Sequence, residues 1–137
     1  MSMETVAPSP REMGRRIASN LASHAWFVAE REGRIAGYCY GGPHRTRAGY
    51  DLTCETAVYI DPQYAGTGIG RALYARLLPV LAERGYHSAI AVVALPGEAS
   101  IALHEAVGYR RVGTFTQAGF KLGKWCDTLW MQRMLTD

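Results

Sequence analysis

The chain has 137 residues, of which 48% are hydrophobic and 20% are charged, a composition that fits one globular domain with a substantial core. Its formal net charge of +3 suits an anionic ligand, but the basic residues are scattered and give no support to a nucleic-acid-binding surface. The cysteines form no C-x-x-C pair and the histidines have no ligand spacing, which argues against a metal site or a disulfide framework. With no signal core and no apolar run of membrane-spanning length, we expect a cytoplasmic protein without a membrane partner.

The predicted elements follow the order α-β-β-β-α-β-α-β-β, which indicates an α/β (α+β) protein with a mixed sheet and helices on its faces. No repeat, low-complexity tract or linker divides the sequence, so we expect one domain over residues 1–137. Ser9 and Pro10 predict the start of the first helix, whose apolar face carries Met13, Ile17 and Leu21. The predicted helices span residues 10–23, 69–85 and 97–107, and the predicted strands span residues 26–30, 35–40, 50–60, 88–95, 109–116 and 128–135.

Some of these elements carry specific expectations. Residues 50–60 are long for one strand and indicate a bulge. Residues 88–95 are almost continuously apolar between two helices, which predicts a buried parallel strand. In the second helix a leucine recurs at every fourth position and marks the core face, while Pro79 predicts a kink or a local irregularity. Residues 118–126 read as a connection between the last two strands.

The segment VYIDPQYAGTGIGRAL, residues 58–73, predicts a strand, a glycine-rich loop and the start of a helix. Free N–H groups and the helix dipole favour an anion at such a point, and Gly66, Gly68 and Gly70 would let it approach closely. The G-x-G-x-G spacing fits neither the dinucleotide fingerprint nor the P-loop. A tight turn without a ligand is the alternative, but three glycines directly before a helix favour a phosphate site.

Three groups of side chains are candidates for chemistry. Glu55 is an acid within a strand, where acids are depleted; it is either a general base or a residue that faces solvent or pairs with an arginine. His104, in the third predicted helix, is either a packing residue or a proton-transfer group. Arg45, Arg47 and Tyr50 form either a solvated basic loop or a clamp for an acidic substrate group, since arginine binds carboxylates bidentately.

Four segments carry a family resemblance. YIDPQYAGTGIGRALYARLL resembles motif A of the GNAT acyl-CoA N-acetyltransferases, whose pattern is Arg/Gln-x-x-Gly-x-Gly/Ala. With AGYDLTCETAVYIDP, IAVVALPGEASIALHEAVGY and AGFKLGKWCDTLWMQR, the chain is similar to the phosphinothricin (methionine sulfoximine) acetyltransferases over roughly residues 25–135. The resemblance implies a GNAT fold, a homodimer, and transfer of an acetyl group from acetyl-CoA to the amino group of a small amino-acid-like acid. Another amine or antibiotic as acceptor, and a CoA-binding module without turnover, are the alternatives.

The resemblance also implies roles for individual residues. Glu55 would be the general base, and His104 takes the position where many GNAT enzymes carry a tyrosine general acid. Arg47, Tyr50 and Glu55 match positions that hold the substrate. Backbone amides of residues 66–71 would bind the pyrophosphate of coenzyme A, and residues 58–60 would run beside its pantetheine arm. The cofactor-binding residues implied are Val58, Tyr59, Ile60, Ala65, Gly66, Thr67, Gly68, Ile69, Gly70, Arg71 and Ser100.

Three features depart from the family pattern. Ala65 replaces the Arg/Gln that opens the loop motif, and Gly97 stands where asparagine is common. The strand and helix with which the family normally begins are expected to be absent. That departure predicts either a truncated chain or a sheet edge that stays open or is covered by a partner.

Overall fold

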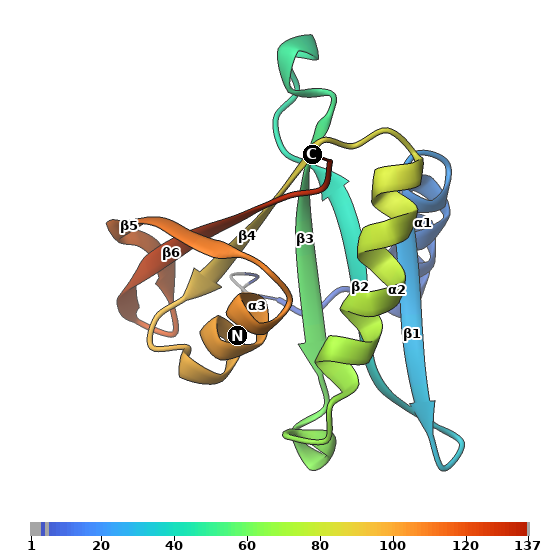
Figure 1. Cartoon of the computed structure of the whole chain (residues 1–137). Helices are drawn as coiled ribbons and strands as arrows, with labels where there is room; N and C mark the ends of the chain where they lie inside the picture. The colour runs from blue at the N-terminus through green and yellow to red at the C-terminus, as the bar shows by residue number, and fades with distance from the viewer. Residues whose placement is uncertain (1–3, 5, 137) are drawn as a thin grey trace.

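The computed structural model describes residues 4 and 6–136, and within that part six strands form one sheet in the order β1-β2-β3-β4-β6-β5 (Figure 1). The predicted order of helices and strands and the mixed sheet are confirmed. The elements are α1 (Pro10–Leu21), β1 (Ala25–Arg31), β2 (Arg34–Pro43), η1 (Ala48–Tyr50), β3 (Thr53–Ile60), η2 (Pro62–Tyr64), α2 (Ile69–Glu83), β4 (Ser88–Ala94), α3 (Glu98–Ala106), β5 (Arg110–Lys121) and β6 (Lys124–Met134).

Strands β3 and β4 form the parallel pair of the sheet, and they stay together for three positions only. Their pairing begins at Thr53 with Ser88 and ends at Glu55 with Ile90. Figure 1 shows the two strands diverging beyond this point, with β4 turning toward the β5–β6 hairpin. On its other edge β4 pairs antiparallel with β6 along its whole length. The prediction of a buried parallel strand is therefore confirmed for its first half, on the β3 side.

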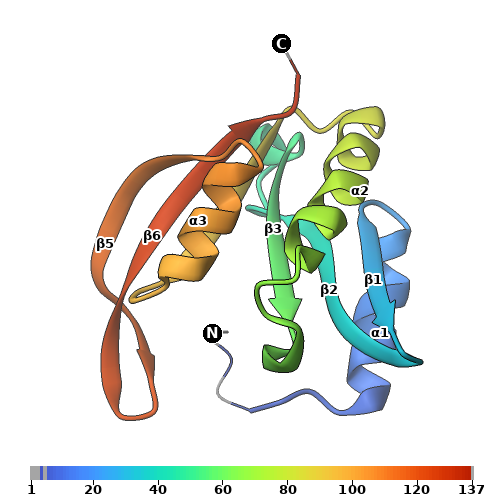
Figure 2. The ribbon, with the colours of Figure 1, turned by 60° about the horizontal axis from the view of Figure 1, so that its bottom comes forward.

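Helices cover both faces of the sheet, as predicted. The predicted core face of α2 is confirmed, because Leu73, Leu77 and Leu81 are all buried. The helix packs on β1 and β2 so closely that a Cβ at Gly41 would lie 2.9 Å from a Leu81 methyl group. It continues through Pro79 without interruption and stops before Gly85, whose φ of +97° suits a glycine after a helix. Figure 2 shows α1 beneath β1 and β2, away from α2.

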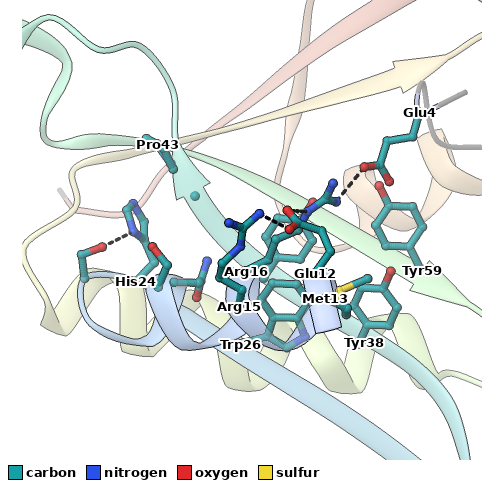
Figure 3. Close-up of a pocket in the computed structure, with 15 residues that line it drawn as sticks. Glu4, Glu12, Met13, Arg15, Arg16, His24, Trp26, Tyr38, Pro43 and Tyr59 are labelled. Carbon is teal, nitrogen blue, oxygen red and sulfur yellow. Dashed lines mark hydrogen bonds and ion pairs between the residues drawn. The ribbon is translucent and has the colours of Figure 1, made fainter. Parts of the chain in front are cut away.

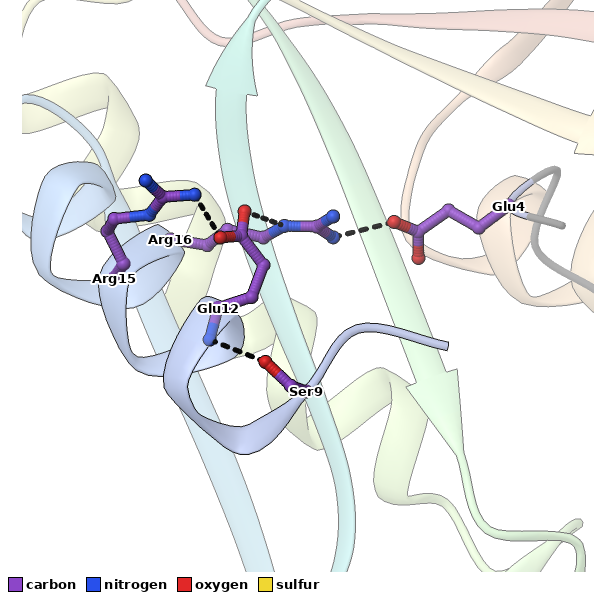
Figure 4. A network of polar contacts seen from close by, with 5 residues as sticks. All are labelled: Glu4, Ser9, Glu12, Arg15 and Arg16. Atoms are coloured by element: carbon purple, nitrogen blue, oxygen red, sulfur yellow. Dashed lines mark hydrogen bonds and ion pairs between the residues drawn. The ribbon is translucent and has the colours of Figure 1, made fainter. Parts of the chain in front are cut away.

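Helix α1 has the predicted N-cap, and its apolar face is only partly covered. The Ser9 side chain accepts a hydrogen bond from the Glu12 N–H at 3.1 Å. Glu12 also forms ion pairs with Arg15 and Arg16, which lower the pKa of its carboxyl, and Arg16 reaches Glu4 at 2.6 Å (Figure 4). The helix ends at Leu21, two residues earlier than expected. No α1 residue is fully buried, and Leu21 is 49% exposed, so the predicted apolar face is only partly covered.

Two strand predictions were wrong at their ends. Residues 48–50 form a 3-10 turn, so β3 is shorter than the expected strand, and it pairs with β2 in an unbroken register with no bulge. The residues assigned to a connection, 118–126, instead form the end of the β5–β6 hairpin. Leu122 and Gly123 both have positive φ, of 53° and 74°, as in the tight turns that suit the twist of a hairpin.

Candidate active site

The glycine-rich loop joins β3 to α2 through η2. Gly66 and Gly68 have φ of +75° and +85°, in the left-handed region that glycine enters with little strain. Gly68 is the N-cap of α2 and brings no side chain to its first turn; the N–H of Ala72 donates to the Gly68 carbonyl at 3.1 Å. The amides before Ala72 precede the intrahelical ladder, at the positive end of the helix dipole. This arrangement is suited to an anion.

A cavity of about 110 Å³ lies where β3 and β4 separate. Four residues of the predicted site, Val58, Tyr59, Ser100 and His104, line it. Gly97 also lines it, and a Cβ there would lie 2.7 Å from the carbonyl oxygen of Ala94, the last residue of β4. An asparagine at this position would therefore require its neighbours at the end of β4 to shift.

His104 is buried inside a hydrogen-bonded chain. Its Nδ1 lies 2.7 Å from the Ser100 carbonyl oxygen, and because a carbonyl only accepts, Nδ1 carries the proton. Nε2 then accepts from the Tyr74 hydroxyl at 2.7 Å. The Tyr109 and Tyr74 hydroxyls lie 2.6 and 3.3 Å from Thr56 Oγ1. Burial lowers the pKa of His104, opposed by the Ser100 hydrogen bond, so the ring is neutral near pH 7.

Glu55 is paired with Gly42 of β2. Because side chains alternate along a strand, Glu55 points to the face of the sheet opposite that of Thr56 and its partner Tyr74. Its side chain remains 35% exposed, and Oε2 lies 3.4 Å from Nδ1 of His44. Edge-to-face contacts hold the His44 ring, with centroids 5.7 Å from Tyr50 and 6.1 Å from Trp130. The carboxylate is therefore partly solvated at the side of an aromatic cluster.

A larger cavity, of about 670 Å³, lies between α1 and this same face of the sheet (Figure 3). Its floor is aromatic: Trp26 stacks on Tyr40 with ring centroids 4.3 Å apart, and Tyr38 contacts Tyr59 at 5.1 Å. One end reaches Gly42, the residue paired with Glu55. The residues that line the cavity are Glu4, Glu12, Met13, Arg15, Arg16, Ser19, Asn20, Ser23, His24, Trp26, Tyr38, Tyr40, Gly42, Pro43 and Tyr59.

The structure brings together only part of the predicted site. Val58, Tyr59, Ser100 and His104 share the cavity between β3 and β4. Tyr50 approaches Glu55 indirectly, by contact with the ring of His44. Arg47 is an exposed residue before η1, outside the described linings of both cavities.

Sequence reasoning missed three residues. His44 and Trp130 contact each other beside Glu55, although His44 follows β2 and Trp130 lies within β6, strands that are far apart in the sequence. Tyr74 is the partner of His104 Nε2 but reads in the sequence as another core position of α2. His44 could be found only from the pairing of β2 with β3 in the structure: once Gly42 is placed opposite Glu55, His44 falls beside that carboxylate.

The described residues include no group of three or more side chains of the kinds that bind metals in a suitable arrangement. None of the helices in residues 6–136 is long and apolar enough to cross a bilayer.

Two known proteins are similar in sequence to this chain. The chain is 43% identical over 110 residues to a phosphinothricin N-acetyltransferase of Streptomyces viridochromogenes, with 80% of this chain and 60% of that protein covered. It is 40% identical over 136 residues to a phosphinothricin N-acetyltransferase of Alcaligenes faecalis, with 98% and 69% covered. The chain thus spans 60–69% of the length of these two relatives.

A solved structure is also similar to this chain. A phosphinothricin acetyltransferase of Sinorhizobium meliloti in complex with AcCoA superposes with a TM-score of 0.93 at 36% identity, covering 98% of this chain and 74% of that one. The sequence family described as the acetyltransferase (GNAT) domain matches residues 2–130. The chain belongs to the GNAT acetyltransferase family.

Proposed function

We propose that this protein transfers the acetyl group of acetyl-CoA to the amino group of a small amino-acid-like acid of the phosphinothricin or methionine sulfoximine type. The observation that carries the proposal is the separation of β3 from β4 beside the glycine-rich loop. The separation opens a cavity between β3 and β4. The anion-suited loop follows the end of β3, and the Glu55 carboxylate lies on β3 just before the residues of that strand that line the cavity. Relatives named for these two substrate types support the choice of acceptor.

The residues present suit acetyl-CoA. In the proposal, backbone amides of residues 66–71 bind the pyrophosphate, with the helix dipole adding to the attraction. Because a main-chain cradle needs no side chain, Ala65 in place of Arg/Gln leaves it intact. Residues 58–60 lie along the arm, and Ser100 and His104 form the facing wall of the cavity.

Glu55 is the proposed general base. Its carboxylate takes a proton from the acceptor ammonium, directly or through water, and leaves the amine with a free electron pair. That pair forms the bond to the acetyl carbonyl carbon and the carbon–sulfur bond breaks. The second proton that the nitrogen loses goes to the departing thiolate, so coenzyme A leaves as the free thiol. The partial exposure of Glu55 lets a soluble amine reach it.

His104 has a different proposed part. The resemblance alone would make it a proton donor to the thiolate, but both of its ring nitrogens are engaged and the ring is neutral. We therefore propose that His104 holds the wall of the cavity that faces the thioester and fixes Tyr74 behind it. Its loss would disturb the position of the thioester more than the protonation of the product.

Arg47 and Tyr50 are the proposed partners of the acceptor's acidic group, since guanidinium pairs bidentately with carboxylate or phosphinate. A second candidate acceptor is an amine with a bulky apolar part. The aromatic floor of the cavity beside α1 favours it, because stacked rings bury such a group well.

We also propose that the protein is a cytoplasmic homodimer. The β5–β6 hairpin projects from the sheet and carries Phe120, Leu122 and Trp125, which are 55–83% exposed. Apolar side chains gathered in this way support a homodimer through this hairpin. The three cysteines are all free, which supports a reducing compartment such as the cytoplasm.

The test is thiol release from acetyl-CoA with a panel of acceptors that includes phosphinothricin, methionine sulfoximine and bulkier amines. Glu55→Gln is expected to lower kcat by about 10²- to 10⁴-fold, the range of a general base. Glu105→Gln, which alters an exposed acid paired with Arg111, is the matched control and should leave the rate unchanged. Acetyl-CoA binding without transfer to any amine would refute the enzyme and leave a CoA-binding module.

A further inference from the structure

His44 is a closely packed polar side chain beside Glu55. It follows the last residue of β2, and its side chain is only 10% exposed. Tyr50 and Trp130 meet its ring edge-on from two other segments, η1 and β6. These contacts fix the plane of the ring, so that its nitrogens point in set directions.

One of those nitrogens, Nδ1, lies near a carboxylate oxygen of Glu55. His44 Nδ1 is fully buried and makes no aligned hydrogen bond within residues 6–136, yet Glu55 Oε2 lies 3.4 Å from it. A buried polar atom without a hydrogen bond destabilises a fold, so its retention beside a carboxylate calls for a reason. Hydrogen bonds at catalytic groups are often long in the free enzyme and shorten when substrate binds.

We propose that His44 is a positioning residue for Glu55, with Nδ1–H donating to Oε2 and leaving Oε1 to take the proton from the acceptor amine. The inference rests on the proposed function, since it needs Glu55 as the base. In the reaction one proton passes from the amine nitrogen to Oε1, the nitrogen–carbon bond forms, the carbon–sulfur bond breaks, and the second proton of the nitrogen goes to the departing thiolate. His44 keeps its own proton throughout and acts only through the carboxylate.

Two substitutions separate the hydrogen bond from the packing of the ring. His44→Phe keeps an aromatic ring between Tyr50 and Trp130 and removes the donor. His44→Asn gives up the ring but places an amide N–H near the former Nδ1. We expect His44→Phe to lower kcat by about 10- to 100-fold, as for a displaced catalytic group, with KM for acetyl-CoA unchanged. His44→Asn should recover most of that rate, and His87→Asn, at an exposed histidine far along the chain, should match the parent.

The pattern of rates decides the matter. A purely structural ring would give the reverse order, with His44→Phe active and His44→Asn impaired, and that order would overturn the inference. Equal activity of all variants would also overturn it. If the unsubstituted protein itself transfers no acetyl group, the proposed function fails instead, and the two failures are told apart by that measurement.

A second measurement needs no activity. Nitrogen-15 chemical shifts of the His44 ring, recorded on the full chain at a pH where the ring is neutral, report which nitrogen carries the proton. We expect protonated Nδ1, although free histidine favours the other tautomer. An unprotonated Nδ1 facing Glu55 would refute the inference even in a protein that is fully active.

Discussion

Replacing Gly68 by alanine separates strain in the loop from contact with a ligand. A Cβ at this position would meet nothing within 4 Å, so no clash enters the argument. The cost lies in φ of +85°, because a residue with a Cβ pays about 1–2 kcal/mol in the left-handed region. If acetyl-CoA binds the loop in the conformation described above, this cost must lower either the stability of the free protein or its affinity for acetyl-CoA.

The cost can appear in two places, and their sum is fixed. If the free protein keeps the loop, Gly68→Ala lowers the free energy of unfolding by about 1–2 kcal/mol and leaves affinity alone. If the free loop relaxes, stability is unchanged and the Kd for acetyl-CoA rises by about 5- to 30-fold, since about 1.4 kcal/mol is a factor of ten. Mixed outcomes divide the same total between the two measurements.

Urea unfolding and calorimetric titration with acetyl-CoA measure the two parts on the same preparation. Gly14→Ala is the matched control, because Gly14 lies within α1 with open space around it and alanine favours a helix. A Gly68→Ala protein that loses neither stability nor affinity would refute the reasoning that links this backbone angle to the anion site.

Three further predictions follow from other parts of the structure. His104→Ala should lower the free energy of unfolding by about 1–3 kcal/mol, because the buried Tyr74 hydroxyl loses its acceptor; an unchanged urea midpoint would contradict the hydrogen-bond chain. The pKa of His104 is lower in the folded state than its unfolded value of about 6.5, so below that pH the unfolded chain takes up the extra proton and stability falls. His104→Gln should flatten this part of the stability–pH curve, measured by thermal unfolding between pH 5 and 8, and an identical slope in both proteins would show that another group is responsible. Leu122→Asp with Trp125→Asp should yield a monomer in light scattering with the fold retained, and a dimer that survives both changes would place the interface elsewhere.

Local patterns predicted much of the fold. The order of elements, the leucine face of α2 and the N-cap of α1 all depend on residues within one or two turns of each other. The 3-10 turn at residues 48–50 and the full length of the β5–β6 hairpin did not follow from local pattern. Gly119 and Gly123 look like breaks in a sequence, but a projecting hairpin accommodates them.

The residues of the site also fall into two groups, those that a local sequence pattern predicts and those that it does not. Gly66, Gly68 and Gly70 were identifiable because three glycines before a helix form a contiguous pattern. The contact between His44 and Glu55 depends on strand pairing, and Trp130 reaches them only because β6 lies beside β4. Residues brought together by the sheet register leave no periodic trace in the sequence, so a single chain could not reveal them.

The short β3–β4 ladder has a consequence for how the sheet responds to its ligand. Beyond Glu55 and Ile90, the edges of the two strands that face each other no longer bond across the gap, although each strand is still paired on its far side. An extended molecule carrying amide groups could enter there as an additional rung and join two half-sheets into one. By hydrogen-bonding to both strands, such a molecule would hold the two parts of the sheet together. It would slow hydrogen exchange in residues 56–60 and 91–94 at the same time, although the polypeptide itself makes no hydrogen bond between these two segments.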